Sequence, residues 1–163
     1  MKDVWLLRHA KSSWDDPALA DHDRPLAPRG LKASRRIGRW ATANGVRPDL
    51  VLCSSATRAE ATIDLVREQV DVPEPVIEKR LYHASAVELL HRLAKVDDEF
   101  DSVLVVAHNP GLHDLVALLA PPGPAEFPTG ALAGISLDLA RWRSIAPGCG
   151  RLDAFVVPRS LTG

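Results

Sequence analysis

The chain has 163 residues, of which 46% are hydrophobic and 25% charged, and its 20 Lys and Arg against 21 Asp and Glu give a net charge of −1. This composition predicts one folded domain over residues 1–163 and excludes disordered, collagen-like and coiled-coil chains. Near neutrality argues against a nucleic-acid-binding protein that neutralises many phosphates, so any anion chemistry is expected at a local site.

The cysteine content and the amino terminus bear on the cellular compartment. Cys53 and Cys149 are the only cysteines, which is typical of a reducing compartment, although a single disulfide between them stays open. Residues 1–8 lack the long apolar stretch of a secretory signal, and no apolar run approaches the roughly 20 residues of a membrane helix. We therefore expect a cytoplasmic protein without a membrane partner.

The first half of the chain predicts two pairs of strand and helix. A short apolar run at 4–7 is typical of a buried strand, and residues 28–44 then predict a helix that begins at a proline and ends before a glycine. A second apolar run at 50–53 leads into Thr57-Arg58-Ala59-Glu60, which matches a capping box at the start of a second helix. Arg58 would then lie in the first turn of that helix.

The second half predicts two more helices and three more strands. Residues 86–95 carry apolar side chains at helical spacing, 103–107 form a buried strand, and Asn109 is the expected N-cap of a fourth helix. The runs at 132–139 and 154–157 follow each other without a clear helix, so part of the sheet is expected to be antiparallel. The alternation predicts a three-layer α/β/α fold with a mostly parallel central sheet.

The first predicted helix has a basic side opposite its apolar one. It is formed by Arg29, Lys32, Arg35, Arg36 and Arg39. Two interpretations stay open, because such a face either binds an acidic partner or is simply solvated.

Three predicted strands run into cationic or imidazole side chains at their carboxyl ends. Arg8 and His9 follow the first strand directly. Arg58 follows the second strand after a short turn, and His108 follows the strand at 103–107. Parallel strands bring their carboxyl ends to one edge of the sheet, where α/β proteins bind ligands. Because guanidinium groups and helix amino termini match phosphate oxygens, these four residues predict a phosphate site.

Three segments carry a resemblance to a known family. Residues 7–10 (Leu-Arg-His-Ala), 54–62 and 106–110 resemble the histidine phosphatase superfamily in order and spacing, over about residues 4–137. Residues 24–26 (Arg-Pro-Leu) and Gly30, together with the short chain, resemble its SixA-like phosphohistidine phosphatases. The resemblance implies a phosphoglycerate mutase-like fold.

The family also implies roles for the matching residues. His9 would be the nucleophile that forms a phosphohistidine intermediate, and Arg8, Arg58 and His108 would surround the phosphoryl group. A neutral imidazole is a competent nucleophile near pH 7, and fixed cations stabilise the charge of the transferring group. This scheme requires no metal and no cofactor. Lys11 and Ser12 would contact the phosphate or the departing group, unless they only form a polar loop.

The chain departs from the family pattern at two positions. Ala10 replaces the usual glycine after the nucleophile, and His83 stands where many members carry a Glu or Asp that protonates the leaving group. His83 would contact the substrate, unless it is only a surface residue. His83 itself, Glu78 or Glu88 could donate the proton, or no donor is needed, since a phosphoramidate bond is weaker than an ester bond.

The missing acid favours phosphohistidine on a protein as the substrate. A small phosphorylated metabolite, hydrolysed as a phosphoester, stays open as the alternative, as does a module that binds a phosphorylated ligand without turnover. No nucleic-acid partner is expected.

Two other kinds of site are rejected. Cys53 and Arg58 are separated by four residues rather than the five of the cysteine-dependent phosphatases, so Cys53 is assigned to the core. Asp21-His22-Asp23 resembles a set of metal ligands but lacks a recognised spacing, so we expect a solvated loop and no metal site.

Overall fold

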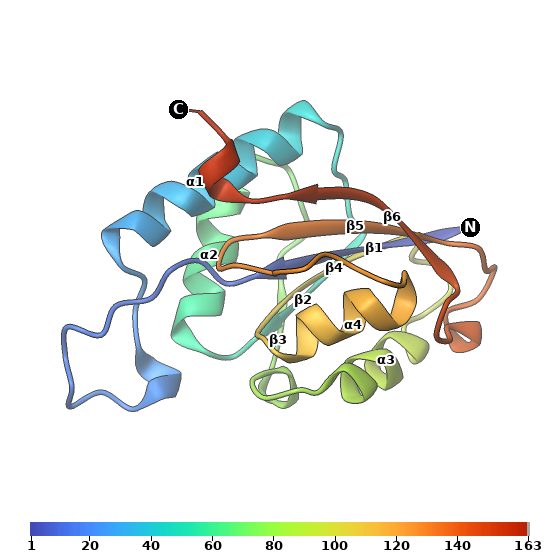
Figure 1. Ribbon diagram of the computed structural model, residues 1–163, viewed down its shortest axis with the longest axis horizontal. Helices are drawn as coiled ribbons and strands as arrows, with labels where there is room; N and C mark the ends of the chain where they lie inside the picture. The colour runs from blue at the N-terminus through green and yellow to red at the C-terminus, as the bar shows by residue number, and fades with distance from the viewer. Residues whose placement is uncertain (163) are drawn as a thin grey trace.

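The computed structural model describes residues 1–162, which fold around a six-stranded sheet in the order β3-β2-β4-β1-β5-β6 (Figure 1). The first four strands in this order are parallel, and β5 runs antiparallel to both of its neighbours. The expected mostly parallel sheet with an antiparallel part is confirmed. The strands are β1 (Lys2–Arg8), β2 (Leu50–Ser54), β3 (Val76–Glu78), β4 (Ser102–Ala107), β5 (Leu132–Leu137) and β6 (Gly150–Val156).

Two helices cover each face of the sheet, which confirms the three-layer architecture (Figure 1). α1 (Pro28–Ala43) packs beside α2 (Thr57–Arg67), and α3 (Ala86–Ala94) packs beside α4 (Gly111–Leu119). Successive residues of a strand point to opposite faces. Leu6 of β1 therefore lies in the core under α3 and α4, whereas Leu7 lies in the core under α1 and α2. Burial on both faces explains why the central strands read as continuous apolar runs.

The helix starts differ from the sequence prediction at two places. Thr57 is the first helical residue of α2 rather than its N-cap, and the N-cap Ala56 makes no side-chain bond. The hydroxyl of Ser54 accepts a hydrogen bond from the Ala56 amide at 3.2 Å, so the predicted capping box is wrong. α4 begins at Gly111, two residues after the expected N-cap Asn109.

A capping box does occur at α3, where the Ser85 hydroxyl and the Glu88 carboxylate each accept a backbone N–H, both at 3.1 Å. The sequence prediction missed β3, because Val76 and Ile77 are exposed and the strand is short. Both cysteines are free, and Cys53 is buried in the core as expected. No helix within residues 1–162 is long and apolar enough to cross a membrane.

The strand register and one long loop together shape the edge where the sheet's parallel strands end. Arg8 of β1 pairs with Ala107 of β4, and Cys53 of β2 pairs with Val106, so the three carboxyl ends lie side by side. The loop after β1 returns toward its start, since the Lys11 carbonyl accepts the Ala27 amide at 2.9 Å. A Cβ on Gly30 would lie 2.1 Å from that same carbonyl, so only glycine permits this close approach.

Candidate active site

The two histidines and two arginines at the strand ends line one hollow of about 270 Å³. Arg8 ends β1 and His9 follows it, Arg58 is the second residue of α2, and His108 follows β4. The imidazole centroids of His9 and His108 are 5.0 Å apart. The structure therefore brings together the four residues that the sequence placed at one edge, in what we call the His-Arg hollow.

His9 is held in one tautomer and kept neutral. Its Nδ1 lies 2.8 Å from the Ala10 carbonyl oxygen. Because a carbonyl only accepts, Nδ1 carries the hydrogen and Nε2 keeps its lone pair. Burial lowers the pKa of His9 to about 4, against the Ala10 hydrogen bond that raises it, and the charges of Arg58 and Arg8 lower it further. At neutral pH this imidazole is uncharged, which is the state that a nitrogen nucleophile requires.

His108 is also neutral at pH 7. Its pKa is lowered to about 3. Burial is the main cause, and the charges of His9 and Arg58 lower the pKa further. Its Nε2 lies 2.7 Å from the Ser54 hydroxyl, which fixes the ring against the end of β2.

These low pKa values predict that acid destabilises the fold between about pH 6.5 and pH 4. In this range the unfolded chain binds protons on ordinary imidazoles and the folded chain does not, so the free energy of unfolding falls with the pH. Each of the two histidines should contribute about 2 kcal/mol to the fall between pH 6.5 and pH 5. Urea unfolding at pH 7 and at pH 5 measures the difference.

Two variants show whether the loss of stability in acid comes from the buried histidines or from titration elsewhere in the protein. His108→Ala should reduce the difference between the free energies of unfolding at pH 7 and at pH 5 by about half, because only the contribution of His9 remains. His91→Ala removes an exposed histidine of α3 and should leave the difference unchanged. An equal difference in the wild type and in His108→Ala would contradict the assignment.

Two buried nitrogens in the His-Arg hollow point to an anionic ligand. Arg8 donates from Nη1 to the Phe127 carbonyl at 3.1 Å, but its Nε has no hydrogen-bond partner among residues 1–162. His108 Nδ1 likewise has none within that range. Buried polar nitrogens without partners are uncommon because each costs free energy, and a phosphate oxygen could satisfy both.

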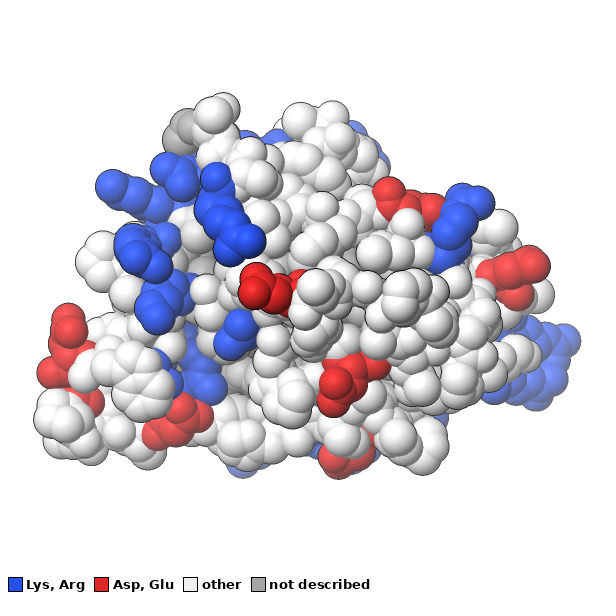
Figure 2. Space-filling view, in the orientation of Figure 1, with Lys and Arg blue, Asp and Glu red and all other residues white. Residues whose placement is uncertain are grey.

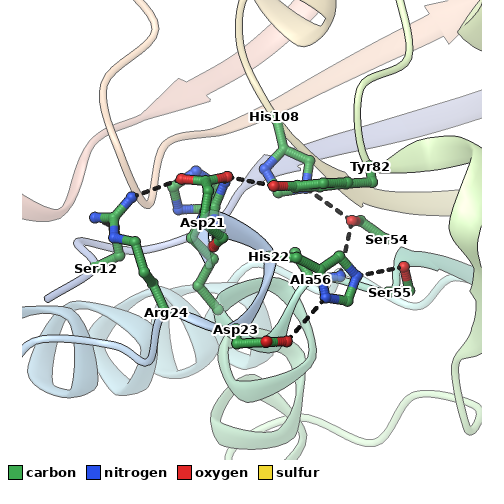
Figure 3. A network of polar contacts seen from close by, with 12 residues as sticks. Ser12, Asp21, His22, Asp23, Arg24, Ser54, Ser55, Ala56, Tyr82 and His108 are labelled. Atoms are coloured by element: carbon green, nitrogen blue, oxygen red, sulfur yellow. Dashed lines mark hydrogen bonds and ion pairs between the residues drawn. The ribbon is translucent and has the colours of Figure 1, made fainter. Parts of the chain in front are cut away.

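Asp21 holds the second arginine of the site and was missed by the sequence analysis. Its carbonyl and its Oδ2 accept hydrogen bonds from Arg58 at 2.7 and 3.0 Å, and its Oδ1 accepts one from Arg24 at 2.9 Å. The Tyr82 hydroxyl also donates to this carboxylate (Figure 3). The bond from Tyr82, with those from Arg24 and Arg58, holds the pKa of Asp21 well below its usual range. Asp21 is therefore ionised and fixes the direction of Arg58.

The expectation of a solvated loop at Asp21–Asp23 is thus wrong in part. The segment forms a short 3-10 helix, and His22 Nε2 lies 2.9 Å from the Ser55 hydroxyl beside the start of α2 (Figure 3). Asp23 stays exposed. Within residues 1–162, no group of three or more His, Cys, Asp or Glu side chains is arranged to hold a metal ion.

The three residues expected to contact substrate all line the His-Arg hollow, although their roles remain predictions. Ser12 is buried, and its hydroxyl accepts a bond from Arg24 Nη2 at 2.6 Å. Lys11 is exposed at the rim, and the exposed His83 stacks on Tyr82 with ring centroids 3.8 Å apart. Trp14 was missed; it lies at the rim, 71% exposed, with the Arg24 guanidinium 3.1 Å from its ring centroid.

The carboxylates considered as proton donors are engaged elsewhere. Glu78 accepts three hydrogen bonds from Arg92 at 2.8, 3.2 and 2.9 Å, and Glu88 caps α3. Within residues 1–162, no Asp or Glu side chain lines the His-Arg hollow. Burial also raises the pKa of the Cys53 thiol, which fits its place in the core rather than a role as a nucleophile.

Known proteins share both the fold and the motifs of this chain. The family model of the histidine phosphatase superfamily (branch 1) matches residues 4–89. An uncharacterized protein of Mycobacterium tuberculosis is 38% identical over 163 residues, which covers 94% of this chain and 100% of the relative. The phosphohistidine phosphatase SixA of Escherichia coli is 32% identical over 139 residues, covering 83% of this chain and 85% of that protein.

A solved structure gives the same result in three dimensions. The protein histidine phosphatase SixA complexed with tungstate superposes with a TM-score of 0.83 at 30% identity, covering 97% of this chain and 98% of that one. The chain therefore belongs to the histidine phosphatase superfamily, a class of phosphatases with a histidine nucleophile. Among its members, this chain is SixA-like.

Proposed function

We propose that the chain hydrolyses phosphohistidine on a protein, with His9 as the nucleophile and Arg8, Arg58 and His108 around the phosphoryl group. The observation that carries the choice of substrate is the lack of a carboxyl group lining the His-Arg hollow within residues 1–162. A phosphoester needs a proton on its alkoxide leaving group, and a general acid typically contributes 10²–10⁴-fold to such a step, an order-of-magnitude range. Imidazole is a better leaving group and depends less on an acid.

The proposed reaction has two displacements at phosphorus. In the first, the His9 Nε2 lone pair forms a bond to phosphorus while the P–N bond of the substrate breaks and its electrons stay on the departing nitrogen; the ring leaves as neutral imidazole because its other nitrogen carries a proton taken from solvent. In the second, a water oxygen attacks phosphorus, the His9–phosphorus bond breaks, and the proton of the water leaves with the phosphate product or to solvent. Arg8 and Arg58 stabilise the charge on the phosphoryl oxygens in both steps.

A comparison of substrates tests the proposal. We expect kcat/KM for a phosphohistidine peptide to exceed that for phosphoserine and sugar phosphates by about 100-fold or more, since only the esters need the missing acid. Release of inorganic phosphate at pH 7 measures all of them, and the activity should persist in a chelator because the proposed steps use only side chains and water.

His83 is the informative control for this comparison. His83→Ala should leave phosphohistidine turnover within a few-fold of the wild type, because the proposal assigns it no proton transfer. A preference for phosphoesters that disappears in His83→Ala would contradict the proposal and identify His83 as the proton donor of a small-molecule phosphatase.

A further inference from the structure

A second hollow, of about 620 Å³, lies next to the His-Arg hollow and is lined by cations. The two share Lys11 and Thr129 in their walls, so they adjoin at that edge. We call it the basic hollow; its charged lining residues are Lys11, Arg29, Lys32, Arg36 and Arg159. Figure 2 shows Lys and Arg side chains gathered at this end of the molecule, over α1 and the end of the chain.

The charges of the basic hollow are poorly compensated within the protein. Within residues 1–162, no Asp or Glu side chain lines it. Among residues 1–162, the one ion pair of its lining joins Arg159 to Glu126 at 3.9 Å, and both side chains are about three quarters exposed, so water and salt weaken it. Arg36 Nε is buried and has no hydrogen-bond partner within the described residues.

The position of these cations in α1 is unfavourable for the helix itself. Arg29 and Lys32 lie in its first two turns, and the first turn carries no acidic residue. Cations near a helix amino terminus oppose the helix dipole, so this arrangement costs stability rather than adding it. The other part of the basic face behaves differently, because Arg35 pairs with Glu68 at 3.1 Å on the side toward α2.

We propose that the basic hollow binds carboxylates on the surface of the phosphoprotein substrate, next to its phosphohistidine; this rests on the function proposed above. The His-Arg hollow already provides the donors for the phosphoryl group, so a second anionic group seated across Lys11 belongs to the same substrate. Cations spread along a helix, with Arg29 and Lys32 exposed and Arg36 half-buried, suit a broad acidic surface and accelerate its approach. Within the basic face of α1, Arg29, Lys32 and Arg36 are thus the residues that would bind the acidic partner.

Two synthetic peptides test the proposal. Each carries one phosphohistidine, flanked in one peptide by glutamates and in the other by glutamines. We expect the wild type to turn over the glutamate peptide with about tenfold higher kcat/KM, mainly through a faster association that declines toward about 300 mM salt. The double variant R29E/K32E should lose this preference while keeping the turnover of the glutamine peptide.

A matched charge reversal controls for net charge. R47E/K95E makes the same exchange at exposed positions in segments that lead toward the amino ends of β2 and β4, on the opposite edge of the sheet, and should keep the preference. R29E/K32E should also melt no earlier than the wild type, because it places acids near the amino terminus of α1.

The possible failures are distinguishable. Equal turnover of both peptides by the wild type would overturn the basic hollow as a docking site and leave the proposed function intact. Turnover of phosphoesters with neither peptide accepted would overturn both. If R29E/K32E impaired turnover of a small bisphosphate more than that of the glutamate peptide, the hollow would be a subsite for a second phosphate, and the proposal would be wrong.

Discussion

His9→Ala should lower phosphohistidine turnover by about 10⁴-fold or more, the scale of loss when a nucleophile is removed. The reason is geometric as well as chemical. His9 donates from Nδ1 to the Ala10 carbonyl and presents a neutral Nε2 in a hollow that holds two guanidinium groups. Alanine keeps the guanidinium groups but leaves no lone pair to attack phosphorus. Single-turnover assays with a phosphohistidine peptide measure the loss.

Trapping the intermediate connects this loss to a covalent step. Acid-labile, base-stable phosphate should appear on His9 when the wild type is quenched with alkali during turnover, and it should be absent from His9→Ala. His113→Ala is the control, since this half-buried histidine bonds the Pro124 carbonyl at 2.8 Å and does not line the His-Arg hollow. Label on His108 instead of His9, or turnover retained in His9→Ala, would show that the nucleophile is misassigned.

The convergence of the four strand-end residues could be predicted because it depends on local patterns. Continuous apolar runs identify buried parallel strands, and such strands end at a common edge. The register then aligns Arg8 with Ala107 and Cys53 with Val106, so that His9 and His108 become neighbours without any long loop having to be placed. Sequence alone sufficed wherever the position of a residue follows from the end of a strand.

The contacts of Asp21 could not be predicted for the opposite reason. Asp21 lies 37 residues from Arg58, and their meeting depends on the path of an irregular loop without hydrophobic periodicity. The only sequence signal for these contacts was that Arg24 follows Asp21 by three residues, and this spacing alone also fits a solvated turn.

The two capping-box patterns show a similar limit. Ser85 and Glu88 form a capping box, whereas the same spacing of Thr57 and Glu60 does not. The difference is tertiary, because β2 ends at Ser54 and its hydroxyl already accepts the Ala56 amide where α2 begins. Both segments lie at a helix start, but only at Ser85 do the side chains of the motif accept the backbone amides.

Arg58→Ala should lower kcat/KM for free phosphohistidine by about 10²–10³-fold, whereas Lys11→Ala should cost less than about tenfold. Arg58 is buried, and Asp21 fixes its direction through two hydrogen bonds at 2.7 and 3.0 Å, so its remaining N–H groups are pre-oriented for phosphoryl oxygens. Lys11 is exposed and flexible at the rim, where water screens its charge.

Two further variants show whether orientation or charge accounts for the loss. Arg58→Lys keeps the charge but not the planar pair of donors, and it should recover little of the activity. Asp21→Asn keeps Arg58 but weakens its hold, and it should lower kcat more than it raises KM because misdirected donors fail mainly in the transition state. The remainder of free phosphohistidine is small, carries no acidic flanking side chains and has an ammonium that balances its carboxylate, so the result should depend little on the basic hollow. Equal losses in Arg58→Ala and Lys11→Ala would mean that the phosphoryl group sits at the rim, outside the position that Asp21 and Arg58 define.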